Sequence, residues 1–203
     1  MALDIAVLAS TNGTDLQAII DSIEAGKLDA ELTCVISNKA GCGALEKAKK
    51  AGVEAIFIDP AEKEREEFDR EVAAELEKRG VKLVVLVGYM RFLSPWFVHK
   101  YGNRIMNIHP SLLPAFAGGM DTDVHQAVLD RGSKVTGCTI HFVDEGADTG
   151  PIIMQKVVKV ENGDTAETLK KKVQAAEMEA YPKAIQLFAE GKLKVEGNQV
   201  KVL

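Results

Sequence analysis

The segment Val81–Val87 is a nearly unbroken run of apolar residues in which valine predominates. Helices cover both faces of a parallel β-sheet, so a strand in the middle of such a sheet has no face in water and is apolar throughout. The run therefore predicts a central parallel strand. A chain built around such a strand is expected to have an α/β fold, with other strands and helices alternating along the sequence.

Strands and helices do alternate in the sequence on both sides of this run. The predicted strands are Leu3–Ala9, Glu31–Ser37, Ala55–Ile58, a segment ending at Asn107 to His109, Val135–Val143, Ile152–Val160 and a minor hairpin around Gly197-Asn198. The predicted helices are a segment starting near Leu16, Gly43–Ala51, Glu62–Arg79, a short helix capped by Ser94, Val124–Asp130, and Thr165–Phe188 with a kink or break at Pro182. We expect one domain over residues 1–203. Its fold would be a single doubly wound, mostly parallel, Rossmann-like α/β sheet with antiparallel strands in the C-terminal part.

The composition excludes several kinds of protein. The chain has 203 residues, of which 46% are hydrophobic and 27% charged, as in an ordinary globular protein. Its net charge of -5 argues against a general nucleic-acid surface. The three cysteines form no CxxC pair, and the sequence has neither a secretory leader nor an apolar run of membrane-spanning length. We therefore expect a cytoplasmic protein without membrane contact, and no metal, because no His or Cys pair has ligand spacing.

Polar residues end the strand that precedes Pro110. Asn107 and His109 lie two residues apart, so their side chains are expected to point to the same side of the strand. Ligands of open α/β sheets bind beyond the carboxyl ends of the strands. An amide that donates to an oxyanion and a histidine whose charge Asp148 can stabilise fit acyl or formyl transfer. The alternative is that His109 and Asp148 are ordinary turn residues.

No nucleophile accompanies these side chains. Ser111 lies beyond a proline, and none of the cysteines falls in these loops. Direct attack by a substrate amine is therefore simpler than a covalent enzyme intermediate. The other histidines have weaker claims, because His99 and His125 lie on predicted helices. His141 alternates with core residues on its strand and is expected to be structural.

The segment Ser10–Thr14 consists of turn residues between the first strand and the first helix. The backbone N–H groups of Gly13, Thr14 and Asp15 would lie at a helix N-terminus, where the helix dipole favours an anion such as phosphate. The turn has neither the GxGxxG spacing of a dinucleotide site nor the lysine of a P-loop. A plain turn in which Thr14 or Asp15 caps the helix is an equal alternative.

Apolar residues near the end of the central strand are candidates for a ligand pocket. They are Leu86, Met90, Phe92, Leu93 and Trp96. A packed crossover between strand and helix is the alternative, because apolar residues are expected there in either case.

Three segments around these candidates form a recognisable pattern: Asn107–Pro114, His141–Val143 and Asp148–Ile153. Together they resemble the formyltransferase family that uses 10-formyltetrahydrofolate. The similarity extends to Ala9–Ile20, Ser37–Ala40, Gly88–Pro95 and Glu177–Pro182, so that nearly the whole chain is covered.

The resemblance implies an enzyme of purine synthesis in which the glycyl amine of glycinamide ribonucleotide takes the formyl group from the folate. The resemblance implies that Asn107 and protonated His109 of this chain stabilise the oxyanion of the tetrahedral intermediate. Asp148 would hold His109 charged and help to move protons through water. The folate is then a cosubstrate, the partners are small molecules only, and the chain is a monomer or a homodimer.

The resemblance also implies binding residues for both substrates. The ribonucleotide would contact Gly13, Thr14, Asp15, Met90, Pro110, Gln174 and Glu177. Its phosphate would lie on the first turn, its ribose hydroxyls on Glu177, and its amine near the Met90 carbonyl. The folate would contact Arg65, Leu86, Arg91, Phe92, Leu93, Val98, Glu145, Gly146 and Ala147, with the two arginines near its glutamate tail.

The sequence departs from the family pattern at two places. The loop Ala115–Asp123 is longer than the Pro-Gly-x-His loop of many members, and Asp15 stands where some relatives have asparagine. We expect this reaction rather than three related functions, because the chain has little room for an added domain and because Asn107, His109 and Asp148 occur together. Methionyl-tRNA formyltransferase shares the Asn-x-His-Pro-Ser-Leu-Leu-Pro signature but adds a tRNA-binding domain, and 10-formyltetrahydrofolate deformylase adds a regulatory domain. A non-catalytic nucleotide-binding module would need only the phosphate turn.

Overall fold

The computed structural model describes residues 2–119 and 121–203, without the side chains of residues 121 and 122. Its strands are β1 (Leu3–Ala9), β2 (Ala30–Ser37), β3 (Glu54–Phe57), β4 (Leu83–Val87), β5 (Ile105–His109), β6 (Val135–Phe142), β7 (Ile152–Lys159), β8 (Leu193–Glu196) and β9 (Gln199–Val202). In this part of the chain they follow the hydrogen-bonded order β3-β2-β1-β4-β5-β6-β7-β9-β8. The predicted α/β class is confirmed. The chain divides into two compact units, Met1–Asn107 and Ile108–Leu203.

The strands of the first unit pair in parallel. β1 pairs with β2 and β4, β2 pairs with β3, and β4 pairs with β5, all in parallel. Every residue of β4 is buried. The apolar run is thus a central strand between β1 and β5, as its composition predicts.

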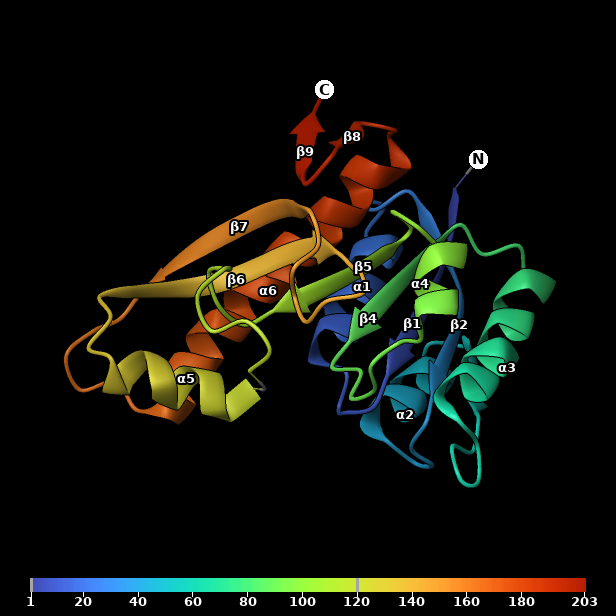
Figure 1. Cartoon of the computed structure of the whole chain (residues 1–203), viewed down its shortest axis with the longest axis horizontal. Helices are drawn as coiled ribbons and strands as arrows, with labels where there is room; N and C mark the ends of the chain where they lie inside the picture. Colours follow the sequence, from blue (N-terminus) through green and yellow to red (C-terminus); the bar gives the residue numbers. More distant parts are fainter. Residues whose placement is uncertain (1, 120) are drawn as a thin grey trace. The chain divides into compact units, whose positions relative to one another are not determined.

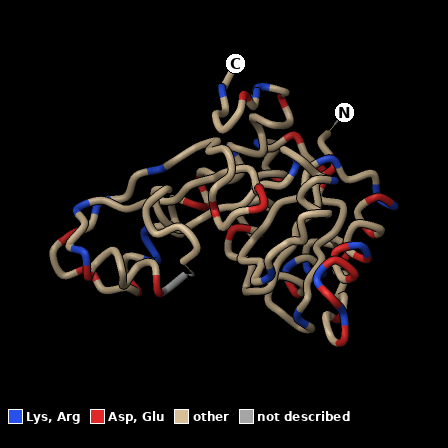
Figure 2. The backbone as a smooth tube through the Cα atoms, viewed as in Figure 1, with Lys and Arg blue, Asp and Glu red and all other residues tan. Residues whose placement is uncertain are grey.

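Helices cover both faces of these strands. They are α1 (Thr14–Glu24), α2 (Gly43–Lys50), α3 (Arg65–Lys78) and α4 (Pro95–Lys100). Figure 1 shows α4 in front of the strands and α1 behind them. Phe68, Val72 and Leu76 of α3 are buried as predicted, while acidic and basic residues alternate along the outside of this helix (Figure 2).

The second unit is built on an antiparallel pair. β6 pairs with β7, as the short acidic loop between them predicts. Helix α6 (Ala166–Ala189) packs on both strands and also contacts α5 (Asp121–Asp130). The predicted C-terminal hairpin is β8 and β9, which turns at Gly197 with φ 61°.

Three predicted helix boundaries are wrong. α1 is capped by Gly13 in the left-handed conformation, so neither Thr14 nor Asp15 is the N-cap. α3 begins at Arg65 rather than Glu62, because Glu62 has a left-handed φ of 57° that a helix cannot include. α5 begins at Asp121 rather than Val124.

Helix α6 continues through Pro182 without a break. Proline inside a helix costs about 3 kcal/mol because it removes a hydrogen bond and crowds the preceding turn. Tyr181, Ala184 and Ile185 on either side of it are fully buried. Their burial offsets the cost, so tertiary packing decides against the predicted break.

Within residues 2–119 and 121–203, no helix combines the length and the apolar character that crossing a membrane requires.

Candidate active site

His109 and Asp148 lie in contact in the second unit. The Nδ1 atom of His109 is 3.1 Å from the Oδ2 atom of Asp148, and both side chains are mostly buried. His109 is the last residue of β5, and Asp148 lies in the loop between β6 and β7. The structure therefore brings together two of the three predicted catalytic residues. The third, Asn107, lies two residues before His109 on the same strand, at the end of the first unit.

The surroundings of His109 match a doubly protonated ring. Its Nε2 atom is 3.0 Å from the carbonyl oxygen of Phe116, while Nδ1 faces the Asp148 carboxylate. Both neighbours are acceptors only, and an imidazole donates from both nitrogens only when it is charged. A charged His109 satisfies both contacts at once.

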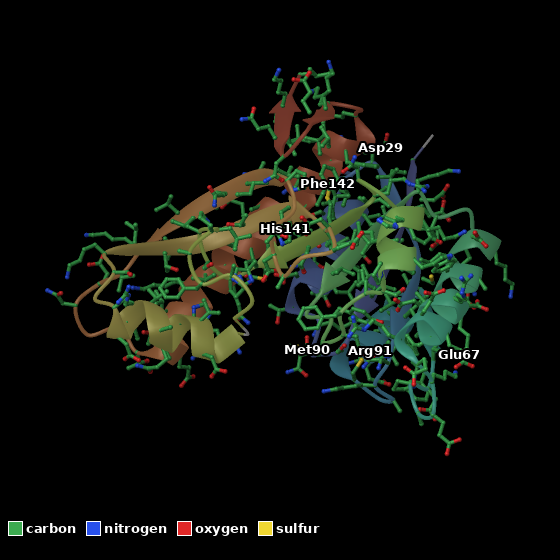
Figure 3. The ribbon with its side chains drawn as sticks, viewed as in Figure 1. Asp29, Glu67, Met90, Arg91, His141 and Phe142 are labelled. Carbon is green, nitrogen blue, oxygen red and sulfur yellow. The ribbon has the colours of Figure 1, made fainter. Side chains whose placement is uncertain are left out.

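His141 is buried on β6, as its alternation with core residues predicts, and it also contacts Asp148. Its Nε2 atom lies 3.5 Å from the Oδ1 atom of Asp148, and its Nδ1 atom is 2.9 Å from the carbonyl oxygen of Phe142. Figure 3 labels both His141 and Phe142. Asp148 thus has a histidine beside each carboxylate oxygen. Sequence reasoning misses His141 because alternation with core residues says where a side chain is buried, not what it touches.

The environment of Asp148 favours the ionised carboxylate. Burial raises the pKa of this group, but hydrogen bonds from His109 and His141, the charge of His109 and the N–H group of Gly118 together lower it far below its ordinary value. The N–H group of Gly118 donates to Oδ2 at 2.9 Å. Asp148 also has a left-handed φ of 56°, a conformation that is uncommon for a residue with a side chain and is often found at functional sites.

Hydrogen bonds between its own residues hold the loop that carries Asp148. The Oδ1 atom of Asp144 accepts hydrogen bonds from the Gly146 N–H group at 3.0 Å and from the Thr149 hydroxyl at 2.7 Å. A side chain at Gly146 would put its Cβ atom 2.0 Å from the Thr149 hydroxyl oxygen, so the Thr149 side chain would have to move and give up its hydrogen bond to Asp144. Asp144 and Thr149 are therefore positioning residues that the sequence analysis does not identify. Of the predicted folate contacts, Glu145, Gly146 and Ala147 are exposed on this loop.

The other predicted ribonucleotide residues of the second unit lie directly after β5 and on α6. Pro110 directly follows His109 and is partly exposed. Gln174 and Glu177 are three residues apart on α6, so they share one face of the helix. Glu177 is 6% exposed, which is unusual for a carboxylate.

The predicted phosphate turn of the first unit follows β1. Gly13 caps α1 without a side-chain hydrogen bond, and Thr14 and Asp15 are the first two residues of the helix. The N–H groups at this end have no acceptor inside the helix. A side chain at Gly13 would bring its Cβ atom 3.0 Å from the Cβ atom of Ala44 and would have to adopt φ 66°. Glycine is therefore required by the conformation and by the close approach of α2.

Ser10 connects this turn to the loop after β4. Its hydroxyl donates to Asn38 Oδ1 at 2.6 Å and accepts the Met90 N–H group at 2.9 Å, and its own N–H group donates to the Gly88 carbonyl at 3.2 Å. The predicted ribonucleotide residue Met90 is thus fixed to the end of β1. The sequence analysis does not single out Ser10, because hydroxyl residues are common in turns.

Asp15 is a buried carboxyl group, 8% exposed, and burial raises its pKa from 3.8 to about 6. A helix N-terminus favours a carboxylate by at most about 2 kcal/mol. Since one pKa unit corresponds to about 1.4 kcal/mol, the raised pKa means that ionised Asp15 destabilises the fold by on the order of 3 kcal/mol. Desolvation is the larger effect here.

Replacing Asp15 by asparagine is therefore expected to stabilise the protein at pH 7.5. Because the pKa is raised, protonated Asp15 makes a contribution to wild-type stability. This contribution is complete below about pH 4 and is lost as the pH rises through about 6. Thermal unfolding should show a melting temperature about 6–12 °C higher for Asp15→Asn at pH 7.5, and almost no difference at pH 4. Asp21→Asn on the exposed face of α1 is the control. A difference that does not depend on pH would contradict this explanation.

The loop between β4 and α4 carries three of the nine predicted folate residues, Arg91, Phe92 and Leu93, while Leu86 lies on β4 and Val98 on α4. Leu86 and Val98 are buried, whereas Phe92 is 68% exposed and Leu93 is intermediate. Arg91 lies over the ring of Phe68 at 4.4 Å from its centroid. Met90 and Arg91 lie beyond the carboxyl end of β4 in Figure 3, as the position rule for α/β sheets predicts.

Asp69 supports this loop from α3. It is 1% exposed, and its Oδ2 atom accepts the N–H group of Ser94, the N-cap of α4, at 2.6 Å. Burial raises the pKa of Asp69, whereas its hydrogen bonds with Ser94 and the charges of Arg91 and Arg65 act in the opposite direction. The charges of Arg65 and Arg91, the two predicted folate arginines, therefore both act on the buried carboxyl group of Asp69.

Replacing Asp69 by alanine is expected to lower the free energy of unfolding by about 1–3 kcal/mol, because the buried Ser94 N–H group loses its acceptor. Asp69→Asn retains an oxygen acceptor and should recover most of this loss. Denaturant unfolding measures the stability, and hydrogen exchange of the Ser94 amide measures the contact directly. Glu66→Gln, on the exposed side of α3, is the control. Unchanged exchange at Ser94 in Asp69→Ala would contradict the assignment.

Among residues 2–119 and 121–203, no group of three or more histidine, cysteine, aspartate or glutamate side chains is arranged to hold a metal ion.

The sequence matches one family model over most of its length. Residues 3–185 match the formyl transferase family. The chain belongs to the formyl transferase family. The phosphoribosylglycinamide formyltransferase of Escherichia coli K12 is 41% identical over 197 residues, which are 97% of this formyl transferase and 92% of the relative.

Two further relatives extend the comparison. The trifunctional purine biosynthetic protein adenosine-3 of Gallus gallus is 47% identical over 192 residues, which are 94% of this formyl transferase and 19% of the relative. The chain thus spans about a fifth of that larger protein. The crystal structure of glycinamide ribonucleotide transformylase 1 from Symbiobacterium toebii has a TM-score of 0.95 and 46% identity, covering 100% of this chain and 94% of that one.

Proposed function

We propose that residues 1–203 form a single formyltransferase domain that transfers the formyl group of 10-formyltetrahydrofolate to the glycyl amine of glycinamide ribonucleotide, in purine synthesis. The observation that carries the proposal is the contact between His109 and Asp148 at the end of the strand that also bears Asn107. The names of the relatives support the same reaction. A cytoplasmic location and a monomeric or homodimeric state stay predictions.

The reaction needs a group that stabilises negative charge. The amine attacks the formyl carbon, a C–N bond forms, and the carbonyl oxygen becomes an oxyanion. The Asn107 amide and the charged His109 ring are donors suited to that oxyanion. For His109 this requires that its Nε2 donor exchanges the Phe116 carbonyl oxygen, now 3.0 Å away, for the oxyanion. When the intermediate collapses, the bond from the formyl carbon to N10 of the folate breaks, and the proton lost by the amine reaches N10.

Asp148 has two tasks in this mechanism. Its carboxylate stabilises the charge on His109 through the 3.1 Å contact. It also helps to move the proton that the attacking amine loses, through water, to N10 of the folate, so that proton number is conserved. His141, beside the other carboxylate oxygen, helps to hold Asp148 in place.

The ribonucleotide is proposed to bind by its two polar ends. Gly13, Thr14 and Asp15 present backbone N–H groups to the phosphate, as a helix N-terminus does for anions. Glu177, with Gln174 one turn away, accepts the ribose hydroxyls. Met90 and Pro110 border the reacting amine, and the Met90 carbonyl orients it.

The folate is proposed to bind along the loops that follow β4 and β6. Leu86, Phe92, Leu93 and Val98 supply apolar contacts to its ring system, and Glu145, Gly146 and Ala147 border it. Arg65 and Arg91 interact with its anionic glutamate tail.

A turnover assay tests this function. Purified protein is mixed with 10-formyltetrahydrofolate, and the release of tetrahydrofolate is followed with and without glycinamide ribonucleotide. The proposal requires fast release that depends on the ribonucleotide. Fast release in water alone would replace it with a deformylase, and ribonucleotide binding without release would favour a non-catalytic module. Formylation of methionyl-tRNA by the same protein would identify the third alternative.

A further inference from the structure

The turn between β1 and α1 is held against helix α2. Figure 1 shows that β1 ends beside this helix. A side chain at Gly43 would bring its Cβ atom 2.9 Å from the Cα atom of Asn12, so the two backbones are in direct contact. The N–H group of Ala44 donates to the Thr11 carbonyl at 3.1 Å. The position of the turn is thus set by α2.

Lys47 of α2 forms a second hydrogen bond to this turn. Its Nζ atom donates to the Asn12 carbonyl oxygen at 2.5 Å, across 35 positions of sequence. The neighbouring basic residue Lys49 pairs instead with Glu46, at 3.0 Å. The contact of Lys47 is therefore specific to its position one turn after Gly43, and does not follow from a general excess of positive charge on the helix.

Both hydrogen bonds fix the direction of a peptide plane. A trans peptide is planar, and its C=O and N–H groups point in opposite directions. Because Ala44 holds the Thr11 carbonyl, the N–H group of Asn12 points away from α2. Because Lys47 holds the Asn12 carbonyl, the N–H group of Gly13 also points away from it. The N–H groups of Asn12 and Gly13 therefore point to the same side as each other and precede the N–H groups at the start of α1. Successive backbone N–H groups of this kind form a concave site for an anion.

We infer that Lys47 is a positioning residue for the phosphate of the ribonucleotide, because it orients the Gly13 N–H group toward that phosphate. The inference rests on the proposed function, which assigns the phosphate to this turn. The ammonium group also adds a positive charge close to the anion site, where the carboxyl group of Asp15 is unfavourable to an anion. Lys47 need not contact the phosphate itself.

Binding and turnover of four variants test the inference. Lys47→Met removes the hydrogen bond and the charge, Lys47→Gln keeps a donor, Lys47→Arg keeps both, and Lys49→Met is the control on the same helix. A hydrogen bond from a charged donor is lost in Lys47→Met, so ribonucleotide should bind about tenfold more weakly by calorimetry. Lys47→Arg should stay within about threefold of wild type, and Lys47→Gln should be intermediate.

A split between kinetic constants separates positioning from damage to the fold. In Lys47→Met the KM for ribonucleotide should rise about tenfold, while kcat at saturation and the KM for the folate stay within about twofold of wild type. Lys49→Met should match wild type in every constant. Equal ribonucleotide binding by Lys47→Met and wild type would overturn the inference, as would an equal loss in Lys49→Met.

The Gly13 amide gives a readout without substrates. Its NMR shift should move in ligand-free Lys47→Met and stay unchanged in Lys49→Met, because only Lys47 holds the preceding carbonyl. An unmoved Gly13 shift would overturn the inference even if wild type is an active transferase. Failure of wild type to bind ribonucleotide would refute the proposed phosphate site, whatever the Gly13 shift does.

Discussion

Replacing Asp148 by asparagine is expected to lower kcat by about a hundredfold or more, because the charged donor to the oxyanion loses its partner. The native carboxylate faces Nδ1 of His109 at 3.1 Å and Nε2 of His141 at 3.5 Å. An amide cannot supply the negative charge that, in the proposed mechanism, stabilises the positive charge of His109. Asparagine tolerates the left-handed φ of 56° at this position, so the backbone of the loop should be retained.

Steady-state kinetics with both substrates saturating measure this effect. Asp130→Asn, an exposed aspartate at the end of α5, is the matched control and should retain wild-type turnover. Binding of each substrate to Asp148→Asn should remain detectable by calorimetry, since the change removes charge stabilisation and not a binding surface. Near-normal turnover of Asp148→Asn would rule out the assigned role of the carboxylate.

Replacing Gly150 by alanine is expected to abolish most activity through the backbone. A Cβ atom at this position would lie 1.9 Å from the Phe142 carbonyl oxygen and 3.2 Å from the Asp144 nitrogen. The adjacent hydrogen bond from Phe142 N–H to the Pro151 carbonyl, at 2.9 Å, closes the end of the β6–β7 pair. Backbone atoms cannot yield as a flexible side chain can, so the strand ends must separate and the loop bearing Asp148 must move.

The size of this effect can be measured in two ways. Displacing a catalytic group by about 1 Å costs on the order of a hundredfold in rate, so kcat of Gly150→Ala should fall at least that far. Its melting temperature should also fall. Gly102→Ala is the control, because the nearest atom to a Cβ there is 3.6 Å away, an ordinary contact. Wild-type turnover in Gly150→Ala would mean that the loop accommodates the methyl group and does not position Asp148.

Much of the fold follows from local patterns in the sequence. The strand β4 is predicted correctly as a central strand because full burial demands an unbroken apolar run. Ser94-Pro95 starts a helix because the hydroxyl accepts the Phe97 N–H group and proline needs no hydrogen bond in the first turn. The misplaced start of α3 and the continuous α6 depend on the backbone of Glu62 and on packing around Pro182, which residue patterns do not reveal.

The candidate site is predictable where one segment carries the signal. Asn107 and His109 lie on one strand, so their position at its end can be argued from the sequence. His141 and Asp69 are missed because their roles depend on contacts with residues distant in sequence. Asp69 did carry a signal, since it shares a face of α3 with Val72, Ala73 and Leu76. An acid on an apolar helix face requires a buried partner, and Ser94 is that partner.

The most direct test of the central claim is to follow the formyl carbon itself. 10-Formyltetrahydrofolate labelled with ¹³C at the formyl group is mixed with this formyl transferase and glycinamide ribonucleotide, and the label is observed by NMR. Direct amine attack predicts that all of the label moves to the ribonucleotide as an amide, at the rate at which tetrahydrofolate appears. Label appearing as formate, or remaining attached to the protein, would contradict direct transfer.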